Sequence, residues 1–272
     1  MLRRHVLRFS IALALTPLLT GFAAAQEIIK LSTTTSTENS GLLTYLLPQF
    51  EASTHTKVHV ISVGTGKALE LAKNGDVDVT LVHARPSEDK FMAAGYGVNR
   101  RDVMYNDFII VGPANDPAGI HGSKDVIGAM KKIVDSKAKF ISRGDNSGTD
   151  QMEKVYWKEV GAKPQTSSYI SAGLGMGEVL TMAAQLQAYT LTDRATYGAY
   201  RAKTGLAVAV QGDPKMFNPY GIIAVNPARY KDINYTGAML LINWLTSDDG
   251  QKKIADFKVD GQQLFYPSAT KQ

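Results

Sequence analysis

The chain has 272 residues, of which 44% are hydrophobic and 20% charged, and it contains no cysteine; this composition indicates a folded globular protein and excludes a disulfide framework. Three of its 30 basic residues, Arg3, Arg4 and Arg8, precede the first acidic residue. The remaining 27 basic and 25 acidic residues give a net charge of +2, which removes any charge-based argument for nucleic acid or an anionic membrane as the main partner.

The first 25 residues have the three-part pattern of a secretory signal peptide. A short basic start is followed by a mainly apolar stretch at residues 9–22 and by small residues that include Ala23 and Ala25. The apolar stretch is shorter than the roughly 20 residues that a bilayer span requires. We therefore predict cleavage after Ala25 and a mature chain that is free in the periplasm.

The first half of the mature chain alternates apolar strands with helices. Strands are predicted at residues 27–32, 58–63 and 77–82, with helices at 42–51 and 67–73. This order is typical of a parallel βαβαβ unit, and the third strand is apolar enough to be buried on both faces. A short strand at 107–111 then leads into turn-forming residues at 112–117, where we place a crossing between two lobes.

A second cycle follows in the same order. It comprises strands at 139–142, 167–171, 188–192 and 207–210 and helices at 150–160, 177–187 and 193–203. A second crossing is predicted at 221–225, and a final helix at 238–257 is split near residues 247–250. The α/β pattern therefore predicts two lobes joined by two crossing segments, with a ligand cleft between them. We assign residues 26–111 and 215–272 to lobe 1 and residues 112–214 to lobe 2.

Hydroxyl and glycine residues gather where predicted strands end and helices begin. Residues 32–37 are six consecutive serines and threonines, and residues 64–66 are Gly, Thr and Gly. A helix N-terminus offers unpaired N–H groups and a partial positive charge, so both places suit an anion. Helix capping would explain one or two of the six hydroxyls and leave the rest unexplained.

A third such place, residues 142–149, contains an arginine. Arg143 brings a planar fork of five donors that suits an oxyanion, and Ser147 and Thr149 add hydroxyls. The alternative for this segment is a surface pair between Arg143 and Asp145, with Ser147 or Thr149 capping the helix.

No motif in the sequence indicates a catalytic centre or a metal site. The histidines are scattered, no HExxH spacing occurs, and no GxSxG elbow or Walker loop is present. His83 ends a strand that we predict to be buried, which is typical of a core or cleft-edge histidine. Because no nucleophile with a base is apparent, we predict a protein that is not an enzyme.

Five segments together resemble the TupA-type tungstate-binding proteins of ABC importers, in order and over nearly the whole mature chain. They are residues 31–43 (LSTTTSTENSGLL), 64–85 (GTGKALELAKNGDVDVTLVHAR), 141–149 (ISRGDNSGT), 189–197 (YTLTDRATY) and 218–227 (NPYGIIAVNP). The resemblance implies a type II periplasmic binding protein fold that closes on one tungstate dianion and delivers it to a membrane permease. It also implies a monomer without a cofactor, in which tungsten is bound as the oxyanion and not by direct ligation.

Carried over residue by residue, the resemblance implies a set of ligand-binding residues. They are Thr34, Thr35, Ser36, Gly64, Thr65, Arg143, Ser147 and Thr149.

The segment from Arg143 to Thr149 also resembles the RxDxSGT motif of phosphate-binding proteins. Phosphate near neutral pH carries a proton and favours a carboxylate acceptor, whereas tungstate and molybdate are fully deprotonated and favour donors alone. Asp145 turned aside to brace Arg143 would favour the metal oxyanions, and Asp145 turned inward would favour phosphate. The threonine-rich first loop favours tungstate, with a molybdate- or phosphate-binding protein of the same fold as alternatives. Alternatives from other classes are an extracytoplasmic phosphate-ester hydrolase and an adhesion module without a small ligand.

Overall fold

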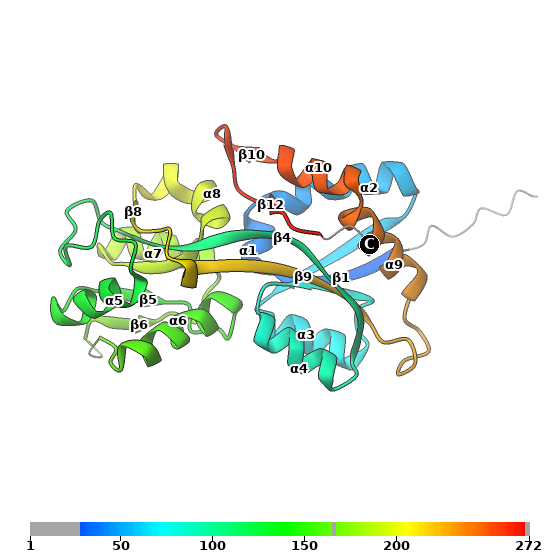
Figure 1. Cartoon of the computed structure of the whole chain (residues 1–272), viewed down its shortest axis with the longest axis horizontal. Helices are drawn as coiled ribbons and strands as arrows, with labels where there is room; N and C mark the ends of the chain where they lie inside the picture. The colour runs from blue at the N-terminus through cyan, green and yellow to red at the C-terminus, as the bar shows by residue number, and fades with distance from the viewer. Residues whose placement is uncertain (1–27, 165–166, 270–272) are drawn as a thin grey trace, which may run out of the picture.

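A computed structural model of the chain describes residues 28–164 and 167–269, so the predicted signal peptide lies outside the described residues. Two lobes lie side by side, and the long strands β4 (Gly97–Gly112) and β9 (Phe217–Val225) run between them (Figure 1). In this part of the chain, no helix has the length and apolar character needed to cross a membrane.

Lobe 1, on the right of Figure 1, is built on the predicted parallel βαβαβ unit. Its elements are β1 (Ile28–Thr34), α1 (Thr35–Asn39), α2 (Leu42–Thr54), β2 (Lys57–Val63), α3 (Thr65–Asn74), β3 (Val79–Val82), α4 (Arg85–Ala93), α9 (Tyr235–Thr246), α10 (Asp248–Asp256), β10 (Lys258–Val259), β11 (Gln262–Gln263) and β12 (Tyr266–Pro267). Strand β1 pairs in parallel with both β2 and β3, and β9 continues the sheet by pairing antiparallel with β3. The four residues of β3 are all buried, as the sequence predicted.

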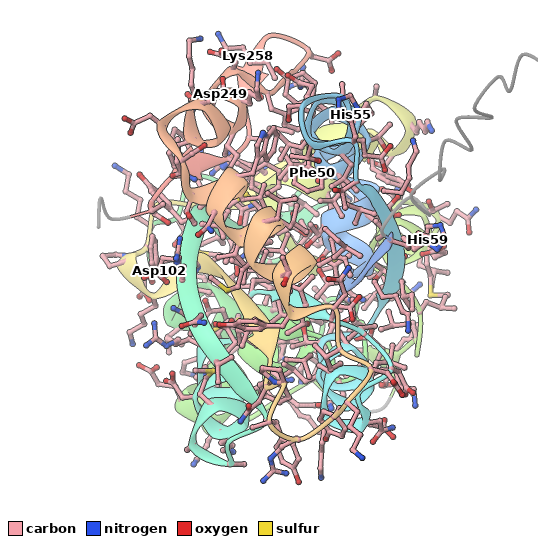
Figure 2. All side chains as sticks on the ribbon, turned by 90° about the vertical axis from the view of Figure 1, so that its right-hand side faces the viewer. Phe50, His55, His59, Asp102, Asp249 and Lys258 are labelled. Carbon is pink, nitrogen blue, oxygen red and sulfur yellow. The ribbon has the colours of Figure 1, made fainter. Side chains whose placement is uncertain are left out.

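Helices cover both faces of this sheet, which explains why β3 has no solvent-exposed face. One apolar core joins the sheet to α2, α9 and α10, and a second joins it to α3 and α4. Figure 2 views this end of the lobe with α9 in front and labels Phe50 of α2, whose ring meets the edge of Trp244 in α9 at a centroid distance of 5.6 Å.

Lobe 2 repeats the arrangement with shorter strands. Its elements are α5 (Val126–Asp135), β5 (Phe140–Ser142), α6 (Gly148–Val160), β6 (Tyr169–Ser171), α7 (Met176–Leu186), β7 (Thr190–Asp193), α8 (Arg194–Thr204), β8 (Ala207–Val210) and the 3-10 helix η1 (Pro214–Met216). One core packs α5 and α6 against the strands, and another packs α7 and α8 against them.

The crossing strands are longer than the sequence predicted. Residues 97–107 of β4 pair antiparallel with β9 in lobe 1, and residues 108–112 pair with β7 and β8 in lobe 2. The sequence indicated only residues 107–111, because the preceding stretch carries Arg100, Arg101 and Asp102 and lacks an apolar run. Backbone pairing with β9 makes this polar stretch a strand. The exact lobe boundaries at residues 111/112 and 214/215 stay a prediction.

Candidate functional site

Polar residues that lie far apart in the sequence meet at the carboxyl ends of the strands. In lobe 1, β1 ends at Thr34, β2 is followed by Gly64, and β3 is followed by His83. In lobe 2, β5 is followed by Arg143. Parallel strands place their carboxyl ends at one edge of a sheet, so the loops of each lobe collect at the edge that faces the other lobe.

A cluster of hydroxyls lies at the end of β1. Thr34, Ser36 and Thr37 are fully buried. Thr34 caps α1, because its Oγ1 accepts a hydrogen bond from the Thr37 amide at 3.2 Å. The same oxygen lies 3.0 Å from Ser36 Oγ and 2.7 Å from Thr37 Oγ1.

Arg143 reaches from lobe 2 into this hydroxyl cluster. Its side chain is 1% exposed, and Nη2 donates to Thr35 Oγ1 at 2.9 Å. Arg143 Nε and Nη1 are buried and have no hydrogen-bond partner among the residues that the structure describes. A buried, charged donor without a partner is costly, so these two N–H groups indicate the place of an acceptor that the chain itself does not supply.

Asp145 braces Arg143. Its Oδ2 accepts from Arg143 Nη2 at 2.5 Å, and its Oδ1 accepts from the Ser147 amide at 3.1 Å. Of the two arrangements that the sequence left open, the structure has the one in which the carboxylate turns to the arginine.

The two lobes also meet at the start of α3 and α6. The Gly148 amide in lobe 2 donates to Thr65 Oγ1 in lobe 1 at 2.8 Å, and Thr65 is fully buried. Ser147 caps α6 by accepting from the Asp150 amide at 3.2 Å. Thr149 Oγ1 is buried and, within residues 28–164 and 167–269, has no hydrogen-bond partner.

Glycines allow this close approach. A Cβ atom on Gly64 would lie 3.1 Å from the carbonyl oxygen of Asp145 in the other lobe, and one on Gly66 would lie 2.4 Å from Asn146 Nδ2. The Gly66 amide also donates to the Asn146 carbonyl at 3.4 Å. The missing side chains therefore let the loop after β2 lie directly against the loop after β5.

Comparisons with known proteins identify the family of the chain. A family model described as a PBP superfamily domain matches residues 21–249. The tungstate-binding protein TupA of Peptoclostridium acidaminophilum is 49% identical over 251 residues, which make up 91% of this chain and 88% of that protein. The chain belongs to the TupA family.

Solved structures of relatives have the same fold. The structure described as the tungstate ABC transporter from Geobacter sulfurreducens is 55% identical, with a TM-score of 0.79 over 85% of this chain and 99% of that chain. The tungstate-binding protein TupA from Desulfovibrio alaskensis G20 is 44% identical, with a TM-score of 0.77 over 90% of this chain and all of that chain. The predicted fold is thus confirmed. The curated TupA relatives are described as binding proteins and not as enzymes, in agreement with the predicted absence of catalysis.

All eight residues that the TupA resemblance implied lie in one region between the lobes. Three contacts tie them together: Thr34 with Ser36, Thr35 with Arg143, and Thr65 with the amide of Gly148, which lies beside Ser147 and Thr149. Their contacts with an anion stay a prediction. Ser147 and Thr34 each have a second role, since both oxygens cap helices.

His83 is not among the binding residues that we predicted for this TupA-family site. The residue is 3% exposed, and its Nε2 lies 3.0 Å from Ser36 Oγ and 3.1 Å from Thr34 Oγ1. Burial lowers the pKa of His83 to about 4, the Asn218 hydrogen bond opposes that shift, and the positive charge of Arg143 adds to it. The imidazole is therefore neutral at physiological pH. Its signal in the sequence was its position directly after a buried parallel strand.

Ser36, His83 and Asn218 have the hydrogen-bond order of a hydrolase triad, which the sequence did not reveal. His83 Nδ1 lies 3.0 Å from Asn218 Oδ1 on the side away from Ser36. A general base works best with a pKa near the working pH, and a pKa of about 4 makes His83 a poor base at neutral pH. The low pKa of His83 therefore argues against the hydrolase alternative.

Lobe 2 adds a buried carboxylate beside the site. Asp193 caps α8 by accepting from the Thr196 amide at 2.8 Å, and Thr196 Oγ1 donates to the Ser36 carbonyl of lobe 1 at 3.0 Å. Burial raises the pKa of Asp193, and the hydrogen bond from the Thr196 amide and the charge of Arg143 oppose that rise. In the described ranges, no group of three or more His, Asp or Glu side chains is arranged to hold a metal ion.

Proposed function

We propose that the chain is a periplasmic solute-binding protein that captures the tungstate dianion between its lobes and delivers it to the membrane permease of an ABC importer. The observation that carries this proposal is the buried Arg143, whose Nε and Nη1 have no protein acceptor in the described structure and lie in a site lined with hydroxyls. The TupA relatives are named as tungstate-binding proteins, which supports the choice of anion.

The free hydrogen-bonding groups of the site favour an anion without a proton. Arg143 Nε and Nη1 are donors only, and the Thr149 hydroxyl is able to donate. The two carboxylate oxygens of Asp145 accept hydrogen bonds from Arg143 and from the Ser147 amide, which is the orientation that favours a fully deprotonated oxyanion over hydrogenphosphate. Tungstate and molybdate carry no proton at neutral pH and suit such a site, whereas phosphate carries one and suits it poorly.

Binding is coupled to closure of the two lobes. Hydrogen bonds from Arg143 to Thr35, from Gly148 to Thr65 and from Thr196 to Ser36 all cross from lobe 2 to lobe 1. An anion that contacts donors from both lobes has a higher affinity for this closed arrangement and shifts the population toward it. The permease then distinguishes the loaded protein by its shape.

The location and assembly of the protein complete the proposal. Residues 1–25 act as a cleaved signal peptide, and the mature chain works in the periplasm as a monomer. It needs no resident cofactor, because tungsten enters and leaves as the oxyanion. The relative from Geobacter sulfurreducens is described as part of a tungstate ABC transporter, which supports a permease partner.

The first test is thermal unfolding of the protein exported from the full chain and purified from the periplasm. Tungstate, molybdate, sulfate and phosphate are added in parallel, and the mass of the purified protein reports whether the N-terminus is Gln26. A native-state ligand at about 100 times its Kd adds roughly 2.7 kcal/mol to the unfolding free energy. A large shift with tungstate and none with phosphate is expected. A shift with phosphate alone would overturn the proposed ligand, and no shift with any of the four anions would overturn the binding function.

A further inference from the structure

The His83 ring contacts the hydroxyl cluster at the end of β1 and the crossing strand β9. Its Nε2 edge faces the hydroxyls of Thr34 and Ser36, and its Nδ1 edge faces Asn218 on crossing strand β9. The ring stacks on Tyr220 of β9, with a centroid distance of 4.6 Å and an interplanar angle of 21°.

Lobe 2 also packs against this ring. A Cβ atom added to Gly148, the first residue of α6, would lie 3.2 Å from His83 Cε1 and 3.2 Å from Nδ1. A side chain at this position would therefore be in unusually tight contact with the ring. The stacking on Tyr220 and the nearby α6 backbone restrict rotation of the imidazole.

A pair of buried asparagines determines which ring nitrogen carries the proton. Asn106 of β4 and Asn218 of β9 are register partners on the two crossing strands, and Asn218 Nδ2 donates to Asn106 Oδ1 at 2.7 Å. This bond turns Asn218 Oδ1 toward His83, so that Nδ1 carries the proton and donates. Nε2 is then the acceptor, and the groups within its reach are the two hydroxyls of Thr34 and Ser36.

We propose that His83 is a positioning residue of the anion site. Its Nε2 accepts a hydroxyl hydrogen from Thr34 or Ser36 and holds both hydroxyls in the geometry that receives the oxyanion, while Asn218 and Asn106 hold the ring tautomer. The inference rests on the proposed function for its ligand and on the hydrogen-bond geometry for its mechanism. Because tetrahedral anions of equal charge differ mainly in size, positions of hydroxyls determine the selectivity among them as well as the affinity.

Two substitutions separate positioning from packing. In His83→Asn the amide nitrogen replaces Nδ1 and keeps the bond to Asn218, but no acceptor reaches Thr34 and Ser36. In His83→Gln the amide oxygen lies near the former Nε2 and restores that acceptor. The matched control is His59→Asn, since His59 is an exposed histidine on the outer strand β2 (Figure 2).

The measurements are the Kd values for tungstate and sulfate by calorimetry, with thermal unfolding of each anion-free variant to confirm folding. Loss of one buried hydrogen bond predicts that His83→Asn binds tungstate about tenfold more weakly, with a smaller ratio of tungstate to sulfate affinity. His83→Gln is expected to recover most of the affinity, and His59→Asn to equal the wild type. Equal losses in the two His83 variants, or no loss in His83→Asn, would overturn the positioning role.

A second readout needs neither a variant that folds nor a bound anion. In 15N-histidine NMR spectra of the wild-type protein at neutral pH, His83 is expected to show a protonated Nδ1 and an unprotonated Nε2. Its signals are recognised by their titration near pH 4. The opposite tautomer would overturn the inference. If the wild type binds none of the anions, the proposed function fails, while the tautomer result still decides the hydrogen-bond geometry.

Discussion

The backbone amide of Gly148 in lobe 2 donates a 2.8 Å hydrogen bond to Oγ1 of Thr65 in lobe 1. Donor and acceptor come from different lobes, so this bond requires the two lobes to be in contact, and Thr65 is fully buried where they meet. Because the threonine oxygen accepts from Gly148, its own hydrogen is free to point to an anion. One hydroxyl therefore takes part in lobe closure and in the proposed binding site at once.

Thr65→Val keeps the shape of this residue and removes the hydroxyl. The buried Gly148 amide then loses its partner, which costs about 1–3 kcal/mol in the closed form, so we expect tungstate affinity to fall at least about tenfold. Calorimetry gives the Kd, and Thr44→Val on the exposed face of α2 is the matched control. Equal Kd values for the Thr65 and Thr44 variants would contradict this role.

Arg143→Lys keeps the positive charge and loses the planar fork. One lysine ammonium cannot bond Asp145, Thr35 and an anion in the directions that the guanidinium uses, so we expect a loss on the order of 10- to 100-fold in affinity. Arg143→Glu is expected to abolish binding and leave the fold intact, as judged by circular dichroism. Arg229→Lys is the control, because Arg229 is exposed and lies over the Tyr96 ring. Retained affinity in Arg143→Glu would refute the assigned role.

Gly64→Ala tests the contact between the two loops. The backbone φ of Gly64 is −70°, which alanine adopts without strain, but the new Cβ would lie 3.1 Å from the carbonyl oxygen of Asp145 across the lobe boundary. We expect several-fold weaker tungstate binding and an almost unchanged melting temperature without anion, because the contact is made only on closure. A lower melting temperature with unchanged Kd would instead place the effect within lobe 1.

His83 is expected to make the protein less stable in acid. Its pKa is about 4 in the folded protein and about 6.5 in the unfolded chain, so between these values the unfolded state binds the extra proton. The contribution of His83 to stability is complete above pH 6.5 and falls by about 3 kcal/mol as the pH drops to 4. Urea unfolding of wild type and His83→Gln at both pH values measures this difference. Parallel pH profiles for the two proteins would contradict it.

The contribution of Glu153 to folding stability depends on pH in the opposite direction. Burial raises its pKa to about 7, and hydrogen bonds to its Oε1 from Tyr169 at 2.7 Å and Trp157 at 2.9 Å oppose the rise. The folded state therefore keeps a proton that the unfolded chain loses, and stability falls as the pH rises from 4.5 through 7. Between pH 4 and 8 the stability of Glu153→Gln relative to wild type should increase by about 3 kcal/mol.

The control for this carboxylate is Glu70→Gln, since Glu70 is 55% exposed on α3. Its pH profile of unfolding is expected to follow that of the wild type. A Glu153→Gln profile that also follows the wild type would show that Glu153 is ionised in the folded protein. The effects of His83 and Glu153 overlap between pH 4.5 and 6.5 with opposite signs, so each is measured against its own variant.

Local patterns in the sequence predicted most strands and helices of both lobes, but not the helices α1, α4 and α5. They also predicted the three polar segments that we propose as the anion site. Apolar periodicity identifies buried elements, and hydroxyl and glycine residues at strand ends identify helix entrances, because both signals are local. Residues 97–106 were missed as a strand for the same reason, since Arg101 and Asp102 are paired only through β9, more than 100 residues later.

The way in which these segments meet depends on the tertiary structure. The direction of the Asp145 carboxylate, the contact of Thr65 with Gly148, and the place of His83 between Ser36 and Asn218 all join side chains from different elements. Local sequence contains no information on the distance between such groups. That distance is set by the packing of whole lobes, and a change of one ångström decides whether a buried polar atom has a partner.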